Sequence, residues 1–289
     1  MKAGSDATWL DRVRNSIRLL LRQRNAVVGG VIIAIFLFLA LTAGVISPHS
    51  PYQTNARNRL APPSSEHWFG TDSLGRDILS RVIYGSRISL QVGVIAVSFA
   101  VVVGVTAGLV AGTMGGGIDS LIMRLVDVLL SFPGLLLALV MIAILGPGLT
   151  NAMIAIGIGS SPVFARVTRG QVLSIIELEY VESARALGAR GFRVVTRHIL
   201  PNVLSPIIVL ATMRVATAIM TEASLSFLGL GASPPAASWG GMISEGRRHL
   251  LDYPWVPIIP GVMVLVTVLG FNLFGDGLRD ALDPRIRKI

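Results

Sequence analysis

Residues 180–202 read YVESARALGARGFRVVTRHILPN and form a polar island between long apolar segments. The island carries five charged side chains within sixteen positions, at Glu182, Arg185, Arg190, Arg193 and Arg197. Because ionised side chains are costly in hydrocarbon, this stretch must project into water. Arginines collect in the cytoplasmic loops of membrane proteins, so we expect the island on the cytoplasmic side, where it contacts a partner.

The composition is that of a membrane protein. Of the 289 residues, 52% are hydrophobic and only 14% are charged, whereas about a quarter are charged in a soluble domain. The absence of cysteine excludes disulfides, thiolate metal sites and cysteine nucleophiles. A net charge of +9 is compatible with nucleic-acid binding, but we interpret it as the basic bias of cytoplasmic loops.

Apolar runs near the length of a membrane crossing predict an all-α membrane protein with six transmembrane helices. The predicted spans are residues 26–46, 88–112, 121–145, 151–164, 203–223 and 256–274. The fourth span is short and is interrupted by Gly157, Gly159 and Pro162. No small-residue cleavage site follows the first span, so we expect an uncleaved anchor rather than a signal peptide.

Positive charge sets the predicted orientation, because basic residues favour the cytoplasmic side. Five arginines precede the first span, at Arg12, Arg14, Arg18, Arg22 and Arg24. We therefore predict a multi-pass membrane protein with both termini cytoplasmic. The predicted parts are a basic tail (1–25), a first helix (26–46), an extracytoplasmic segment (47–87), a five-helix core (88–279) containing a cytoplasmic loop (166–202), and a C-terminal tail (280–289).

The island has the pattern of a helix, a turn and a helix. Its first helix is indicated by helical spacing of Tyr180, Ser183, Ala184 and Leu187. Gly188 suits a left-handed C-cap. A second short amphipathic segment carries Phe192, Val195 and Ile199 and ends before Leu200-Pro201. The residues alone leave two interpretations open: a rigid docking knob, or a hairpin that only anchors the fifth span.

Small residues recur every fourth position of the second span, at Ala96, Ala100, Gly104, Gly108 and Gly112. Such stripes let helix backbones approach closely in lipid. We favour packing within the chain over a contact between subunits.

Ionisable residues within the spans are candidates for a transport path. Arg214 and Glu222 lie two turns apart in the fifth span, within roughly 80° of one another around the helix. They either line the path or form a structural pair. Arg124 and Asp127 have the spacing of a local ion pair in the third span.

No catalytic or metal site is indicated by the sequence. The chain has no phosphate-binding G-x-x-x-x-G-K-[ST] loop. Its four histidines, at 49, 67, 198 and 249, do not have the spacing of metal ligands. We therefore predict a chain that is not an enzyme and binds neither metal nor cofactor.

The island also resembles the EAA loop of binding-protein-dependent ABC importers. The matching residues are Glu182, Ser183, Ala184, Gly188, Leu200 and Pro201. Two departures are Ser183 in place of alanine and His198 in place of isoleucine. This resemblance implies that Glu182, Ala184 and Gly188 shape a coupling helix that docks on an ATPase subunit. It further implies that Leu200-Pro201 returns the chain to the membrane.

Further motifs resemble the C-type permeases of dipeptide, oligopeptide and nickel importers. They are FGTDSLGRDILSRVIYGSRISL (69–90), SLSFLGLG (224–231), ASWGGMI (237–243) and FNLFGDGLRDALDPR (271–285). The resemblance implies the type I ABC importer permease fold, one N-terminal helix plus a five-helix core, in the bacterial plasma (inner) membrane. It also implies a B-type permease as partner, two ATPase subunits that bind ATP and Mg²⁺, and an extracytoplasmic solute-binding protein. Dipeptides or short oligopeptides are the expected cargo, with nickel, glutathione or another small solute as alternatives.

The outer motif includes Gly70, Thr71, Asp72, Gly75, Arg76 and Asp77. Its glycines allow tight turns, and its charged side chains can bind one another or backbone amides. We favour a structural role for this motif over a contact with the solute-binding protein.

Two other classes of protein compete with the importer interpretation. A secondary transporter predicts ion-coupling carboxylates at mid-membrane and activity without ATP. A scaffold or receptor predicts that the island is dispensable for uptake. The secondary-transporter class leaves the island unexplained, and the sequence offers few such carboxylates apart from Glu222 and Asp127.

Overall fold

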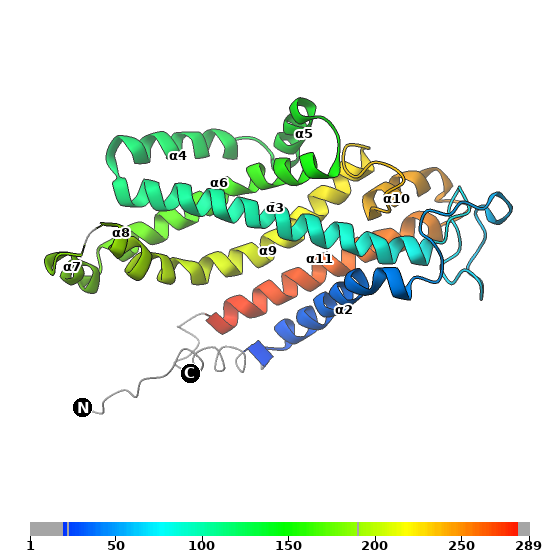
Figure 1. Ribbon diagram of the computed structural model, residues 1–289, viewed down its shortest axis with the longest axis horizontal. Helices are drawn as coiled ribbons and strands as arrows, with labels where there is room; N and C mark the ends of the chain where they lie inside the picture. The colour runs from blue at the N-terminus through cyan, green and yellow to red at the C-terminus, as the bar shows by residue number, and fades with distance from the viewer. Residues whose placement is uncertain (1–19, 22, 190, 283–289) are drawn as a thin grey trace.

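Helices form every regular element of the computed structural model, which describes residues 20–21, 23–189 and 191–282 (Figure 1). The long helices are α2 (Arg24–Ile46), α3 (Ile78–Met114), α4 (Gly116–Leu130), α5 (Gly134–Leu145), α6 (Leu149–Ile176), α9 (Leu200–Phe227) and α11 (Trp255–Leu282). The short ones are η1 (Ala56–Asn58), α7 (Glu179–Ala186), α8 (Gly191–Val194), η2 (Val195–Ile199), α10 (Trp239–Gly246) and η3 (Arg247–His249). The predicted all-α class is confirmed. Most of the two predicted tails, together with Arg22 and Arg190, lies outside the described residues.

Helix α3 is the longest element, with 37 residues and a length of about 55 Å. It begins ten residues before the predicted second span because Asp77 caps it: the carboxylate accepts a hydrogen bond from the Ser80 backbone N–H. Its length exceeds about 30 Å of hydrocarbon, so part of α3 extends beyond the membrane.

The small-residue stripe of α3 packs on α6, as the sequence favoured. A Cβ atom added at Gly104 would lie 2.4 Å from the backbone oxygen of Ser161, and one at Gly108 would lie 2.4 Å from that of Ala165. Figure 1 shows the two helices running side by side. Only glycine allows this backbone separation, so these positions fix how closely the two helices approach.

Four of the described helices are long and apolar enough to cross a membrane: α2, α3, α9 with the turns before it, and α11. The third predicted span, 121–145, is wrong as a single helix. It is divided into α4 and α5, which meet at 97°. Pro133 explains the break, because proline lacks an N–H and disfavours helix in the residue before it. Counting this bent pair as one span gives five.

The fourth predicted span corresponds to α6, which is twelve residues longer at its C-terminal end than predicted. Pro162 lies inside this helix and does not end it. Residues 166–176 of the predicted cytoplasmic loop (166–202) are thus helical. Helix α6 is less apolar than the four spans because it packs against protein on α3, α4, α5 and α9, where glycine and polar residues are tolerated.

The two ends of the bundle differ. In Figure 1, α7 and α8 lie at the same end as the start of α2 and the end of α11. Helix α10 and the segment between α2 and α3 lie at the opposite end. Helices α2 and α11 pack together closely: a Cβ atom added at Gly29 would lie only 2.4 Å from the backbone nitrogen of Phe274.

Candidate functional site

The island forms a projection that we call the knob, residues 179–199. Helix α7 ends at Ala186, and Gly188 follows with φ of +85°. The Ala189 N–H donates to the Ala184 carbonyl across this turn. The predicted left-handed glycine C-cap is thus confirmed.

The knob has a buried side and an apolar exposed side. Val181, Val194 and Ile199 are almost completely buried. Leu187 and Phe192, by contrast, are 89% and 83% exposed. Two large apolar side chains held in water on a fixed support are typical of a surface that a partner covers.

The other predicted residues of the knob lie in α7 and in the turn that follows it. Glu182 and Ser183 are exposed in α7, whereas Ala184 is half-buried. Tyr180 is tied to the start of α9, because Asn202 Nδ2 donates to its hydroxyl at 3.2 Å. A direct hydrogen bond therefore joins the knob to a long apolar helix.

Leu200-Pro201, where the resemblance predicts the return to the membrane, lies within a continuous run of helical turns. Helix α8, η2 and α9 follow one another without interruption, so the second segment of the island runs directly into the fifth span. Pro201 lies in the first turn of α9, where its missing N–H has little effect. The preceding π-helical turn, η2, accommodates the change of direction.

At the opposite end, the outer motif forms a buried ionic cluster. Asp72 accepts hydrogen bonds from the Leu74 and Arg76 backbone N–H groups and from Arg76 Nε at 2.6 Å. Arg76 also donates to Glu245 of α10 at 2.6 Å. Arg81 lies beside both carboxylates, with its Nε 3.5 Å from Asp72 Oδ2.

The two glycines of the outer motif adopt the left-handed backbone conformation that tight turns require. Gly70 and Gly75 have φ of +74° and +73°. Thr71 forms an isolated bridge with Asp77, and its hydroxyl donates to the Asn58 carbonyl. Asp72, Arg76 and Asp77 are each at most 4% exposed. This burial supports the structural role rather than a contact with a partner.

Replacing Arg76 with alanine is expected to lower the free energy of unfolding by about 2–3 kcal/mol, because it leaves buried Asp72 without its closest cation. The value is below that for a fully buried pair because the Glu245 side chain is 33% exposed. Thermal unfolding of the purified protein would measure the loss. Arg57→Ala, at an exposed outer arginine, is the matched control; equal melting temperatures for the two variants would contradict the prediction.

The charged residues of α9 do not form a pair. Glu222 is completely buried and accepts a hydrogen bond from Ser226 at 2.6 Å. It therefore lines no opening in this structure, against one of the two predicted roles. Arg214 is half-buried, and no described residue forms an ion pair with it.

The predicted Arg124–Asp127 pair is also wrong. Asp127 instead pairs with Arg166 of α6, and Asp119 accepts two hydrogen bonds from Arg169 of the same helix. Local spacing predicted a pair within α4, but the neighbouring helix provides two arginines that reach both carboxylates. These pairs fasten α4 to α6.

A cavity of about 650 Å³, not expected from the sequence, opens between α6, α9 and α11. Its lining mixes apolar side chains with Gln171, Asn202, Ser205 and Arg279. The sequence feature that could have indicated this cavity is the presence of these polar residues on three largely apolar helices. A cavity with a few polar groups on an apolar wall is typical of a small-molecule path or binding site.

Residues 104–288 match the family "Binding-protein-dependent transport system inner membrane component", which is more than half of the chain. The chain belongs to this family. Residues 12–63 also match the "N-terminal TM domain of oligopeptide transport permease C". This importer permease is thus an ABC importer membrane subunit with one N-terminal helix ahead of the family core.

Relatives of this permease include two named transporter subunits. It is 48% identical to the dipeptide transport system permease protein DppC of Alkalihalophilus pseudofirmus, over 95% of this chain and 90% of that protein. It is 46% identical to the glutathione transport system permease protein GsiD of Pectobacterium atrosepticum, over 93% of this chain and 90% of that protein.

The fold of the permease is also similar to solved structures. An inward-facing conformation of the MetNI methionine ABC transporter aligns with a TM-score of 0.59 and 20% identity, over 71% of this chain and 98% of that chain. The predicted type I importer permease fold is confirmed.

Proposed function

We propose that this permease forms half of the translocation path of an ATP-driven importer and that its knob docks on an ATPase subunit. The observation that carries the proposal is the exposure of Leu187 and Phe192 on a support fixed by buried residues. The docking surface also includes other residues of the same projection, Tyr180, Glu182, Ser183, Ala184 and Gly188.

The proposed orientation places the knob end of the bundle in the cytoplasm, together with both termini. Arg24 at the start of α2 lies at this end, as the positive-inside rule requires. Two ATPase subunits, which bind ATP and Mg²⁺, then act from the cytoplasm, and this chain is not an enzyme. A homologous B-type permease completes the path, and a solute-binding protein delivers cargo to the outer end.

The transport step follows from how the knob is attached. ATP binding closes the ATPase pair and moves the knob, and the continuous helix from α8 to α9 carries this movement into the bundle. The cavity between α6, α9 and α11 then changes its access from the cytoplasmic side to the outer side. Arg214 is the charged residue of α9 that we propose lies along the path.

Dipeptides or short oligopeptides are the proposed cargo, by similarity to the dipeptide permease relative. The glutathione permease relative favours glutathione, itself a short peptide, as a second candidate. The polar groups of the cavity can bind the amide and carboxylate groups that both cargoes share.

Uptake by the complete importer, reconstituted with its ATPase subunits and solute-binding protein in proteoliposomes, tests the function. We expect uptake of a labelled dipeptide only when ATP and Mg²⁺ are present on the side of the membrane that carries the ATPase subunits. Unlabelled cargo is expected to inhibit this uptake by competition. Glutathione that competes better than unlabelled dipeptide would assign the second cargo. Equal uptake without ATP would refute the importer and favour a secondary transporter.

A further inference from the structure

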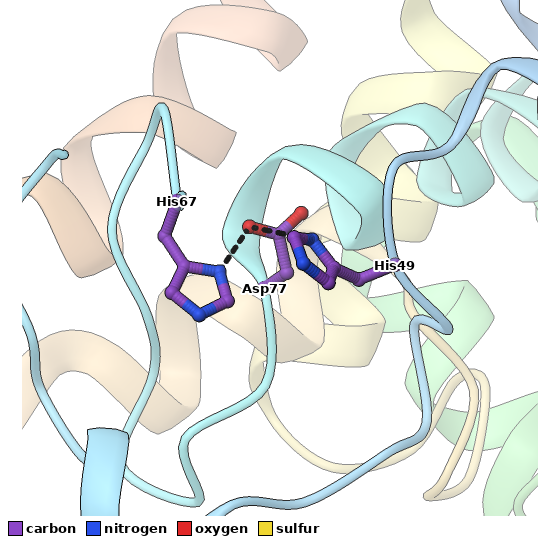
Figure 2. Close-up of side chains that lie close together, drawn as sticks. All are labelled: His49, His67 and Asp77. Carbon is purple, nitrogen blue, oxygen red and sulfur yellow. Dashed lines mark hydrogen bonds and ion pairs between the residues drawn. The ribbon is translucent and has the colours of Figure 1, made fainter. Parts of the chain in front are cut away.

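Two histidines that the sequence analysis set aside lie together with a carboxylate at the outer end of the bundle (Figure 2). His49 belongs to the segment after α2, His67 to the loop before Gly70, and Asp77 is the N-cap of α3. One potential ligand atom from each of the three residues lies within 4.8 Å of the other two. Three segments separated in sequence thus meet at one point.

Hydrogen bonding leaves this cluster incomplete. Asp77 Oδ2 accepts hydrogen bonds from the backbone N–H and hydroxyl of Ser80, both at 2.7 Å. Asp77 Oδ1 lies 3.0 Å from His67 Nδ1, but 3.9 Å from His49 Nδ1, which is too long for a hydrogen bond. His49 Nδ1 is buried and has no hydrogen-bond partner. A buried polar atom without a partner is unfavourable unless something else binds it.

The donor set is that of a transition-metal site. Two imidazole nitrogens and one carboxylate oxygen are the protein ligands of zinc sites that keep an open position. Ligand atoms around tetrahedral zinc lie about 3.4 Å apart, given metal–ligand bonds near 2.0–2.1 Å. The observed 3.0 Å and 3.9 Å lie on either side of that spacing. The third distance, between ligand nitrogens of the two histidines, is at most 4.8 Å, so side-chain rotations must bring the imidazoles closer together to bind an ion. Calcium and magnesium prefer six or more oxygen ligands and do not fit.

The surroundings support an ion at this point. Ser80 orients the Asp77 carboxylate through its second oxygen, as outer partners of metal ligands do. A cavity of about 160 Å³ adjoins the three side chains, and Glu66 and Gln53 also line it. The cavity leaves room for a fourth ligand, either the Glu66 carboxylate or water.

We propose that His49, His67 and Asp77 bind a divalent late first-row transition ion such as Zn²⁺. The ion fastens the segment after α2 and the loop before Gly70 to the N-terminus of α3. It is a resident structural ion, so the proposal does not rest on the proposed cargo or on the direction of transport.

Cobalt binding to the assembled importer, carrying a purification tag without histidines and stripped with a chelator, tests the site. Co²⁺ at a site of low coordination number gives visible absorption bands. We expect one such ion per permease, displaced by Zn²⁺ but not by Ca²⁺. His49→Gln is expected to weaken binding by more than about 100-fold, because loss of a direct ligand exceeds the effect of outer partners.

The variants separate binding from folding. His49 Nδ1 has no hydrogen-bond partner, and the ring lies 4.7 Å from that of His67. His49→Gln therefore removes no hydrogen bond made by Nδ1, and we expect the metal-free protein to fold. Asp77→Asn removes the carboxylate but keeps a good helix cap. His249→Gln is the matched control, because His249 lies at the same end and packs on Tyr253. It is expected to bind Co²⁺ as the unmodified protein does.

Zn²⁺ is also expected to raise the melting temperature of the unmodified protein and of His249→Gln by several degrees, but not that of His49→Gln. The metal site is refuted if the unmodified protein shows no stoichiometric Co²⁺ absorption, or if His49→Gln binds as His249→Gln does. Binding without any change in melting temperature would refute the fastening role.

Discussion

Replacing Leu187 and Phe192 together with aspartate is expected to reduce ATP-driven uptake to background and to release the ATPase subunits during purification. Fully desolvated apolar anchors contribute about 2 kcal/mol or more each to an interface. Loss of two such anchors weakens docking about 1,000-fold, since each 1.4 kcal/mol is a factor of ten. Both side chains are more than four-fifths exposed, so the fold of the permease itself is expected to be unaffected.

The matched control is Leu251→Asp, which introduces the same charge at a leucine that is 94% exposed near the opposite end of the bundle. It is expected to retain its ATPase subunits. The measurements are the amount of ATPase subunit that co-purifies with the permease and the ATP-dependent rate of uptake. Uptake by the double variant at the unmodified rate would show that the knob is not the coupling surface.

Replacing Gly108 with leucine is expected to destabilise the permease by about 4 kcal/mol, at the upper end for an overpacked core. A Cβ atom there would lie 2.4 Å from the Ala165 carbonyl oxygen and 2.6 Å from Thr168 Cβ. Since a backbone carbonyl cannot rotate away as a side chain can, α3 and α6 must separate. That separation loses dispersion contacts along the whole interface.

Thermal unfolding in detergent measures this effect, which corresponds to a fall of about 10 °C in melting temperature or more for a chain of this size. The melting temperature of Gly108→Ala is expected to lie between those of Gly108→Leu and the unmodified protein. Gly261→Leu in α11 is the control, because no heavy atom lies within 4 Å of a Cβ added there. A melting temperature for Gly108→Leu equal to that of Gly261→Leu would disprove the close-packed interface.

Features encoded locally were predicted well. Apolar length located α2, α9 and α11, because any span must contain enough apolar residues to cross hydrocarbon. Gly188 and the glycines of the outer motif were predicted from their position beside turns, and their positive φ agrees. The Ala/Gly stripe predicts a helix contact because small side chains at that spacing let helix backbones approach closely in lipid.

Features that depend on neighbouring helices were predicted less well. The third and fourth spans differ most from their predicted bounds, because Pro133 separates α4 from α5 whereas Pro162 lies inside α6 without ending it. Whether a proline breaks a helix depends on what its surroundings provide for the freed carbonyl. The prediction of an Arg124–Asp127 pair is wrong for a similar reason, because Asp127 forms its ion pair with Arg166 of another helix.

The sequence by itself determined the class of the protein, its family motifs and the polar island that must leave the membrane. The class and the polar island follow from the transfer of each segment between water and hydrocarbon, which depends only on local composition. The family motifs instead rest on a residue-by-residue resemblance. The tertiary structure alone decided that Leu187 and Phe192 are the exposed residues of the knob and that Glu222 is buried. It also brought His49 and His67 to Asp77. Contacts between residues far apart in sequence depend on how whole helices and loops pack, and no local pattern encodes that packing.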